Sequence, residues 1–128
     1  MSAANNLGVT KIGQIAIPAK DVDRAVTFYR DVLELPFLFR YGGLAFFQCG
    51  EVRLLVENPE QTQEGIHSSI LYYQVPEIQQ AYATLQTRGV HFIDEPHMIA
   101  KMADHDLWMV FFHDSEGNTL ALMCEVRP

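Results

Sequence analysis

The feature that most constrains the fold of this chain is a strand–helix pattern that occurs twice, 56 positions apart. In the first copy, alternating side chains over residues 12–18 predict a strand, and apolar residues at helical spacing over 22–35 predict an amphipathic helix capped by Asp21. In the second copy Glu77 takes the place of Asp21, and most apolar positions keep their register. Such small units cannot bury an apolar face alone. The repeat therefore predicts two similar modules that pack together.

Each module is expected to continue from its helix into three strands. Glycines 42–43 predict a tight hairpin, because paired glycines supply the positive φ angles of such turns. Gly89 is placed to end the second helix in a left-handed conformation. The other predicted elements are strands at 37–41, 44–49 and 52–57, a strand at 68–75, a helix at 77–88, strands at 90–93, 107–113 and 119–125, a loop at 94–106 and a turn at 114–118.

The predicted module boundaries follow from these elements. The first module spans residues 12–57 and the second spans 68–125, with a polar linker at 58–67 that contains Pro59 and Gly65. With 128 residues the chain is long enough for one domain of this kind.

Composition disfavours several classes of partner. The net charge of -7 disfavours nucleic acid, because phosphate binding requires clustered Lys and Arg. No apolar stretch approaches the roughly 20 residues that span a bilayer, and residues 1–9 lack the basic start and apolar run of a signal peptide. Cys49 and Cys124 follow strand-like runs and are expected to be buried free thiols. We therefore expect a cytoplasmic protein with no nucleic-acid or membrane partner.

Strand parity assigns side chains to two faces of each predicted sheet, one against the helices and one lining a cleft between the modules. The helix side is expected to hold Ile15, Ile17, Leu55, Leu71, Tyr73, Leu120 and Leu122. The cleft side is expected to hold Gln14, Ala16, Val52, Leu54, Val56, Ser68, Ile70, Tyr72, Thr119, Ala121 and Met123. A mainly apolar cleft with a few polar groups is typical of a small-molecule site. The same pattern is equally compatible with a filled core between the sheets.

The sequence resembles the vicinal oxygen chelate superfamily, which includes glyoxalase I, methylmalonyl-CoA epimerase, the bleomycin- and fosfomycin-resistance proteins and the extradiol dioxygenases. The resemblance rests on residues 14–17 and 21–35 and on the segment FFHDSEGNTLAL at 111–122, and it extends over residues 12–125. It implies a single α+β domain in which two repeated βαβββ modules form a curved mixed sheet around a cleft. It also implies a homodimer with clefts between paired modules.

The resemblance further implies four metal-ligand positions, on the first and last strand of each module. Here they fall on Gln14, Leu54, Ile70 and Ala121. Only Gln14 carries a donor atom, and a divalent site needs at least three donors around open positions. The expected site therefore has no metal at these positions, and a divalent metal held by other residues is the alternative.

Two histidines of the predicted loop at 94–106 are candidate catalytic residues. His97 and His105 lie there with Asp104, and Trp108 follows. Long loops in compact domains often close over binding sites, and a histidine beside a carboxylate is a suitable base near neutral pH. A solvated surface loop with Trp108 in the core explains the same pattern.

Three functions remain open from the sequence. The first is a metal-free binder of a small apolar or aromatic molecule, as in a sequestering or resistance protein. Its expected ligand-binding residues are Gln14, Leu54, Ile70, Tyr72, Trp108 and Ala121, with His97 and His105 closing over the ligand. The second is a glyoxalase-type lyase or isomerase, or a dioxygenase, that uses non-standard metal ligands or metal-free acid–base chemistry. The third is a structural or regulatory dimerisation module with a filled core.

Overall fold

The structure is a computed structural model that describes residues 7–58 and 69–127. Its elements are β1 (Gln14–Pro18), α1 (Val22–Thr27), η1 (Phe28–Val32), β2 (Phe37–Tyr41), β3 (Leu44–Cys49), β4 (Val52–Glu57), β5 (Leu71–Gln74), α3 (Ile78–Thr87), β6 (His97–Lys101), β7 (Asp106–His113) and β8 (Thr119–Val126). Ser68 and the predicted linker beyond Asn58 lie outside the described residues. No helix of the described segments is long and apolar enough to cross a membrane.

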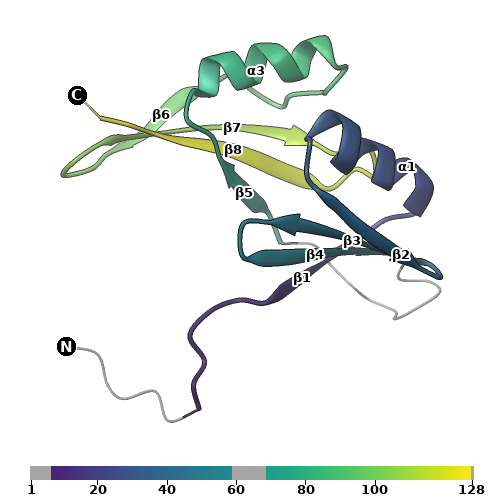
Figure 1. Cartoon of the computed structure of the whole chain (residues 1–128). Helices are drawn as coiled ribbons and strands as arrows, with labels where there is room; N and C mark the ends of the chain where they lie inside the picture. The colour runs from purple at the N-terminus through teal and green to yellow at the C-terminus, as the bar shows by residue number, and fades with distance from the viewer. Residues whose placement is uncertain (1–6, 59–68, 128) are drawn as a thin grey trace.

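The strands form two four-stranded mixed sheets with the same topology. Their orders are β1-β4-β3-β2 and β5-β8-β7-β6, with β1 parallel to β4, β5 parallel to β8, and the other pairs antiparallel. Figure 1 shows α1 against the first sheet and α3 against the second. The matching strand orders confirm the predicted repeat and the α+β fold of two modules.

The first helix begins as predicted but changes type before it ends. Asp21 caps α1, since its carboxylate accepts from the backbone N–H of Arg24 at 3.0 Å. From Phe28 onward the helix has π geometry, in which the N–H of Leu33 donates to the carbonyl of Phe28, five residues back. Helical structure therefore ends at Val32, earlier than predicted, and Glu34 takes a positive φ of 63° where the chain turns into β2.

The predicted loop at 94–106 is wrong in part, because it contains the strand β6. This strand pairs antiparallel with β7, although the register shifts between Met98 and Ala100. Pro96 and its polar neighbours are typical of a loop, and this is why the sequence did not predict the strand. The predicted strand at 90–93 is reduced to a single bridge between Phe92 and Phe112. The second module therefore has the same element order as the first, with β6 in place of the strand predicted at 90–93.

The cleft-face assignment of Val52, Leu54 and Val56 is wrong. In the parallel pairing of β1 with β4, Ile15 lies beside Leu54 and Ile17 beside Val56, so these side chains share the helix face. Leu54 is 2% exposed and Val56 is fully buried. Sequence parity grouped these three residues correctly, but only the register of β4 with β1 decides that the group shares the helix face with Ile15 and Ile17.

One continuous core includes residues of both modules. Its largest fully buried side chains are Tyr29, Phe47, Phe112, Ile17, Leu54, Leu120, Val56 and Val110. Cys49 and Cys124 are free thiols, as expected, and only Cys124 is fully buried.

Hydrogen bonds from the turn between β7 and β8 hold the second module against the first. The buried Asp114 carboxylate accepts from the Tyr29 hydroxyl at 2.5 Å. Glu116 accepts from the Arg24 guanidinium at 2.7 and 3.0 Å, and the Asn118 amide donates to the carbonyl of Pro18 at 2.9 Å. These bonds join residues far apart in sequence, so the helix of the first module and the turn of the second are held together.

Candidate functional site

The sheet face opposite the helices carries a fixed pair of polar side chains. Gln14 opens β1, and its register partner on β4 is Arg53. The Arg53 Nε donates to the Gln14 side-chain oxygen at 2.8 Å. The Arg53 guanidinium also lies 5.5 Å from the centre of the Phe46 ring, within range of a cation–π interaction. The pair is exposed, so its charge is available to a ligand.

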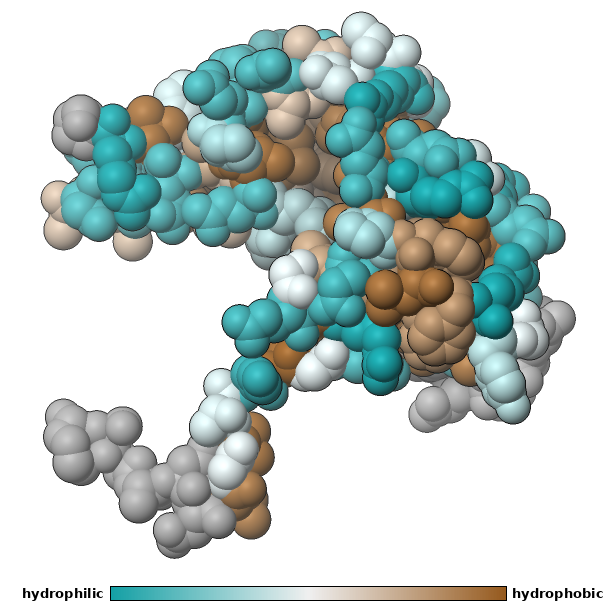
Figure 2. Space-filling view, in the orientation of Figure 1, coloured by the Kyte–Doolittle hydropathy of each residue, from teal (hydrophilic) through white to brown (hydrophobic). Residues whose placement is uncertain are grey.

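Aromatic rings continue this face toward the edge of the first sheet. Phe46 of β3 stacks on Phe39 of β2, with ring centres 4.5 Å apart. Phe39 is 46% exposed. Figure 2 shows hydrophobic surface over the region that Figure 1 labels β2 and β3. The first sheet therefore combines one guanidinium with an exposed apolar surface.

The matching face of the second sheet carries Tyr72 and Ala121 as predicted. These residues are register partners on β5 and β8, and Phe111 of β7 lies beside Ala121. Tyr72 is 45% exposed and meets the Phe111 ring edge to face at 5.9 Å, whereas Ala121 is fully buried. Ile70, just before β5, is 42% exposed. This face also offers apolar and aromatic contacts.

Two of the predicted site residues lie on the other face. Leu54 belongs to the core on the helix side, as described above. Trp108 pairs with Cys124 across β7 and β8 and packs against the same core, so its expected position over the cleft is wrong. Its parity matches that of the buried Val110, which is why the ring turns inward.

The candidate histidines lie away from Tyr72 on the second sheet. His97 is on β6, which β8 and β7 separate from β5, and three interstrand spacings amount to about 14 Å. Its Nδ1 lies 2.8 Å from the carbonyl oxygen of Glu95. His105 is 13% exposed, and its Nδ1 lies 2.7 Å from Asp104. A hydrogen bond from His105 holds the pKa of Asp104 below its ordinary value. The structure therefore does not bring these histidines together with Tyr72.

The residues at the four implied ligand positions do not fit a divalent metal. Gln14 has the only donor atom, and that oxygen already accepts from Arg53, whose positive charge repels a cation. Leu54 faces the core, and the residues before and after it in β4, Arg53 and Leu55, provide no metal ligand either. Ile70 and Ala121 have no donor side chain. Within residues 7–58 and 69–127, no group of three or more His, Cys, Asp or Glu side chains is placed to hold a metal ion.

Arg53 is the site residue that sequence reasoning missed. It lies 39 positions from Gln14, so their contact depends on the register of β1 with β4. The only sequence signal was its place between apolar residues in a strand, where a charged side chain must face away from the core.

Sequence comparison identifies a family for this arrangement. The sequence model of the Glyoxalase/Bleomycin resistance protein/Dioxygenase superfamily matches residues 11–122. No curated protein matches the sequence.

Several solved structures share the fold at low sequence identity. Lactoylglutathione lyase from Agrobacterium tumefaciens superposes with a TM-score of 0.77 at 21% identity, over 91% of this chain and 95% of that one. A superfamily member from Sphaerobacter thermophilus gives 0.77 at 20% identity, over 91% and 98%. An antibiotic binding protein from a Streptomyces species gives 0.71 at 18% identity, over 92% and 98%. At these identities the likeness concerns the fold.

Proposed function

This chain belongs to the Glyoxalase/Bleomycin resistance protein/Dioxygenase superfamily, and on that premise we propose that it binds a small aromatic molecule on the Arg53 face without a metal. The observation that carries this proposal is the hydrogen bond from Arg53 to Gln14. It places a guanidinium where the family's metal chemistry would need donor atoms. A binding role has a precedent in the fold, since one similar structure is that of an antibiotic binding protein.

The chemistry of the face favours an aromatic ligand with a negative or strongly polar substituent. The Arg53 guanidinium is held by Gln14 on one side and by the Phe46 ring on the other. A planar guanidinium is suited to a carboxylate or sulfonate, while rings such as Phe46 and Phe39 stack on an aromatic body. Gln14 orients Arg53 in this proposal.

We propose that a second copy of the chain completes the site. Strand β2 is an edge strand whose five residues are all exposed, and it is rich in aromatic side chains. Exposed apolar edges favour association with another chain. Light scattering coupled to gel filtration should give about twice the chain mass, and Phe39→Lys should give the monomer mass. A monomer at all concentrations would contradict this part of the proposal.

The ligand proposal can be tested with 1-anilinonaphthalene-8-sulfonate, a fluorescent aromatic anion. We expect the native protein to enhance its fluorescence in a saturable manner. Arg53→Ala should weaken binding by roughly tenfold, because a charge-assisted hydrogen bond contributes about 1.5–3 kcal/mol when desolvated and less at an exposed site. The matched control is Arg30→Ala, since Arg30 is an exposed arginine paired with the adjacent Asp31.

Two outcomes would overturn the proposal. Equal affinities for wild type, Arg53→Ala and Arg30→Ala would remove the guanidinium from the site. Near-stoichiometric iron, manganese, nickel or zinc in the untagged protein, resistant to mild chelation, would show that other residues build a metal site. Lyase, isomerase and dioxygenase assays would then be the next measurements.

A further inference from the structure

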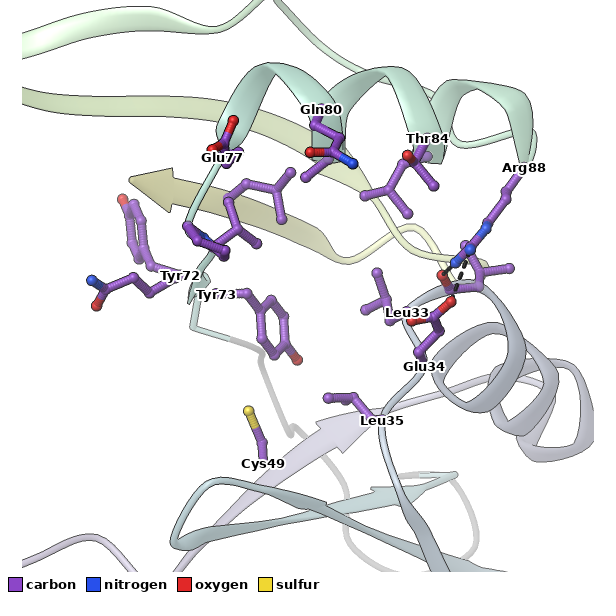
Figure 3. A pocket seen from close by; sticks show the side chains of 17 residues that line it. Leu33, Glu34, Leu35, Cys49, Tyr72, Tyr73, Glu77, Gln80, Thr84 and Arg88 are labelled. Atoms are coloured by element: carbon purple, nitrogen blue, oxygen red, sulfur yellow. Dashed lines mark hydrogen bonds and ion pairs between the residues drawn. The ribbon is translucent and has the colours of Figure 1, made fainter. Parts of the chain in front are cut away.

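A separate cavity lies between the two modules on the helix side of both sheets. Its volume is about 560 Å³, within the range of about 300–1,000 Å³ that small-molecule sites occupy. Its walls come from the end of η1 and the chain that follows, from Cys49 at the end of β3, and from β5 and α3. Figure 3 shows the cavity beneath α3, with the Tyr73 ring projecting into it. The Gln14–Arg53 pair belongs to the opposite sheet face, so the two sites are distinct.

The body of the cavity is apolar. Its apolar lining includes Leu33 and Leu35 of the first module, Leu85 of α3 and Leu122 of β8. Leu85 and Leu122 are buried, while Leu33 and Leu35 pack partly against the core. A surface of this kind favours a hydrocarbon or aromatic body over a hydrated one.

Among the described residues, one buried polar atom of the cavity has no partner. The Tyr73 hydroxyl is buried and makes no hydrogen bond to any described residue. Its oxygen lies at the inner end of the cavity, where Figure 3 shows it directed toward Leu35 and Cys49. A buried donor without an acceptor costs free energy, and an acceptor atom that reaches it recovers that cost. Leu35 and Cys49 are only partly buried, so a rotamer change of either side chain would admit such an atom.

Of the three charged side chains that line the cavity, Arg88 and Glu34 are paired, and Glu77 is exposed at the start of α3. Arg88 donates to Glu34 at 2.8 Å and to the carbonyl of Val32 at 2.7 Å, at the end of the cavity farthest from Tyr72 in Figure 3. Burial raises the pKa of the Cys49 thiol and of the Tyr73 hydroxyl, so both groups stay neutral near pH 7. The interior therefore opposes a charged ligand and accepts a neutral one.

We propose that the cavity between η1 and α3 is a second binding site, which takes a neutral apolar molecule of one or two aromatic rings bearing one acceptor oxygen. The Tyr73 hydroxyl donates to that oxygen, and the leucines surround the apolar body. The Arg88–Glu34 pair joins the two modules across the mouth. This site is independent of the proposed function of the Arg53 face, and its ligand differs from that one in charge.

A matched pair of probes tests the hydrogen bond. Benzophenone and diphenylmethane have nearly the same shape, but only benzophenone has a carbonyl acceptor. We expect wild type to bind benzophenone about tenfold more tightly than diphenylmethane, the ratio expected of one hydrogen bond to a buried donor. In Tyr73→Phe this preference should disappear while diphenylmethane binds as before. The variant should be at least as stable as wild type, because it loses a hydroxyl that has no partner.

The position of the ligand is tested separately. Thr84→Trp places an indole in the cavity and should abolish binding of both probes, whereas Ala83→Trp adds the same indole to the exposed side of α3 and should not. Irradiation of benzophenone bound to wild type should label peptides that contain Leu35 or Leu85. Arg53→Ala should leave all of these results unchanged, which separates this proposal from the first.

Three results would overturn the inference: equal affinity of benzophenone for wild type and Tyr73→Phe, binding unaffected by Thr84→Trp, or labelled residues confined to Phe37–Tyr41 and His97–Lys101. The labelling experiment uses wild type alone, so it locates the bound ligand even if a cavity variant fails to fold.

Discussion

Protonation of Glu116 should weaken the contact between the β7–β8 turn of the second module and α1 of the first. Its side chain is 1% exposed, and one of its oxygens also accepts from the backbone N–H of Asp21 at 2.9 Å, besides the two bonds from Arg24. Burial alone would raise the pKa of this carboxyl, but the hydrogen bonds from Arg24, Asp21 and Ser115 outweigh it and lower the pKa from 4.5 to about 2. The charged form is therefore the one that the fold stabilises.

The sign and size of the effect follow from this shift. Because the folded pKa lies below the unfolded one, the stabilisation is present above pH 4.5 and is lost as pH falls toward 2. A shift of about 2.5 units corresponds to at most about 3.4 kcal/mol. Since the Arg24 side chain is 53% exposed, solvent screening reduces this to an expected contribution of about 1–2 kcal/mol.

Urea unfolding followed by circular dichroism between pH 7 and pH 2.5 measures this contribution. Wild type should lose about 1–2 kcal/mol more than Glu116→Gln between pH 5 and pH 2.5, because the amide does not titrate. Glu51→Gln is the matched control, since Glu51 is 85% exposed and lies 3.7 Å from Lys11. Its profile should follow wild type. Parallel profiles for wild type and Glu116→Gln would refute the reasoning.

Two further predictions concern the buried contacts described above. Tyr29→Phe removes the hydroxyl that donates to the buried Asp114, and it should lower the free energy of unfolding by about 1–3 kcal/mol in urea titrations; an unchanged midpoint would contradict this. Leu54→Ala should cost about 2–5 kcal/mol because it empties a core position, whereas Ile70→Ala, at a position 42% exposed, should cost less than about 1 kcal/mol. In the same thermal or urea assay, a loss for Leu54→Ala below about 1 kcal/mol would place Leu54 outside the core.

Local chemistry explains the elements that the sequence predicted well. Asp21 is followed by apolar residues at helical spacing, and it caps α1 as expected. Gly89 has a positive φ of 83° at the end of α3, also as expected. Such signals depend on neighbouring residues alone, and this is why the repeat could be recognised from the sequence.

Local chemistry was not enough for the strands at the edge of the second module. Strand β6 contains His97 and Lys101 and follows Pro96, so its composition favours a loop. It becomes a strand because β7 offers it a pairing edge. The conformation of this segment is therefore decided by a neighbour rather than by its own propensity.

The sequence by itself determined the repeat, the helix cap and the family, because each depends on residue types at fixed short spacings. Only the tertiary structure decided which face of β4 is buried, that Arg53 reaches Gln14, and that a cavity separates η1 from α3. The physical reason is that alternation only sorts the side chains of β4 into two sets, and the register with β1 decides which set shares the helix face. The cavity likewise depends on how two modules dock, which no spacing within either module encodes.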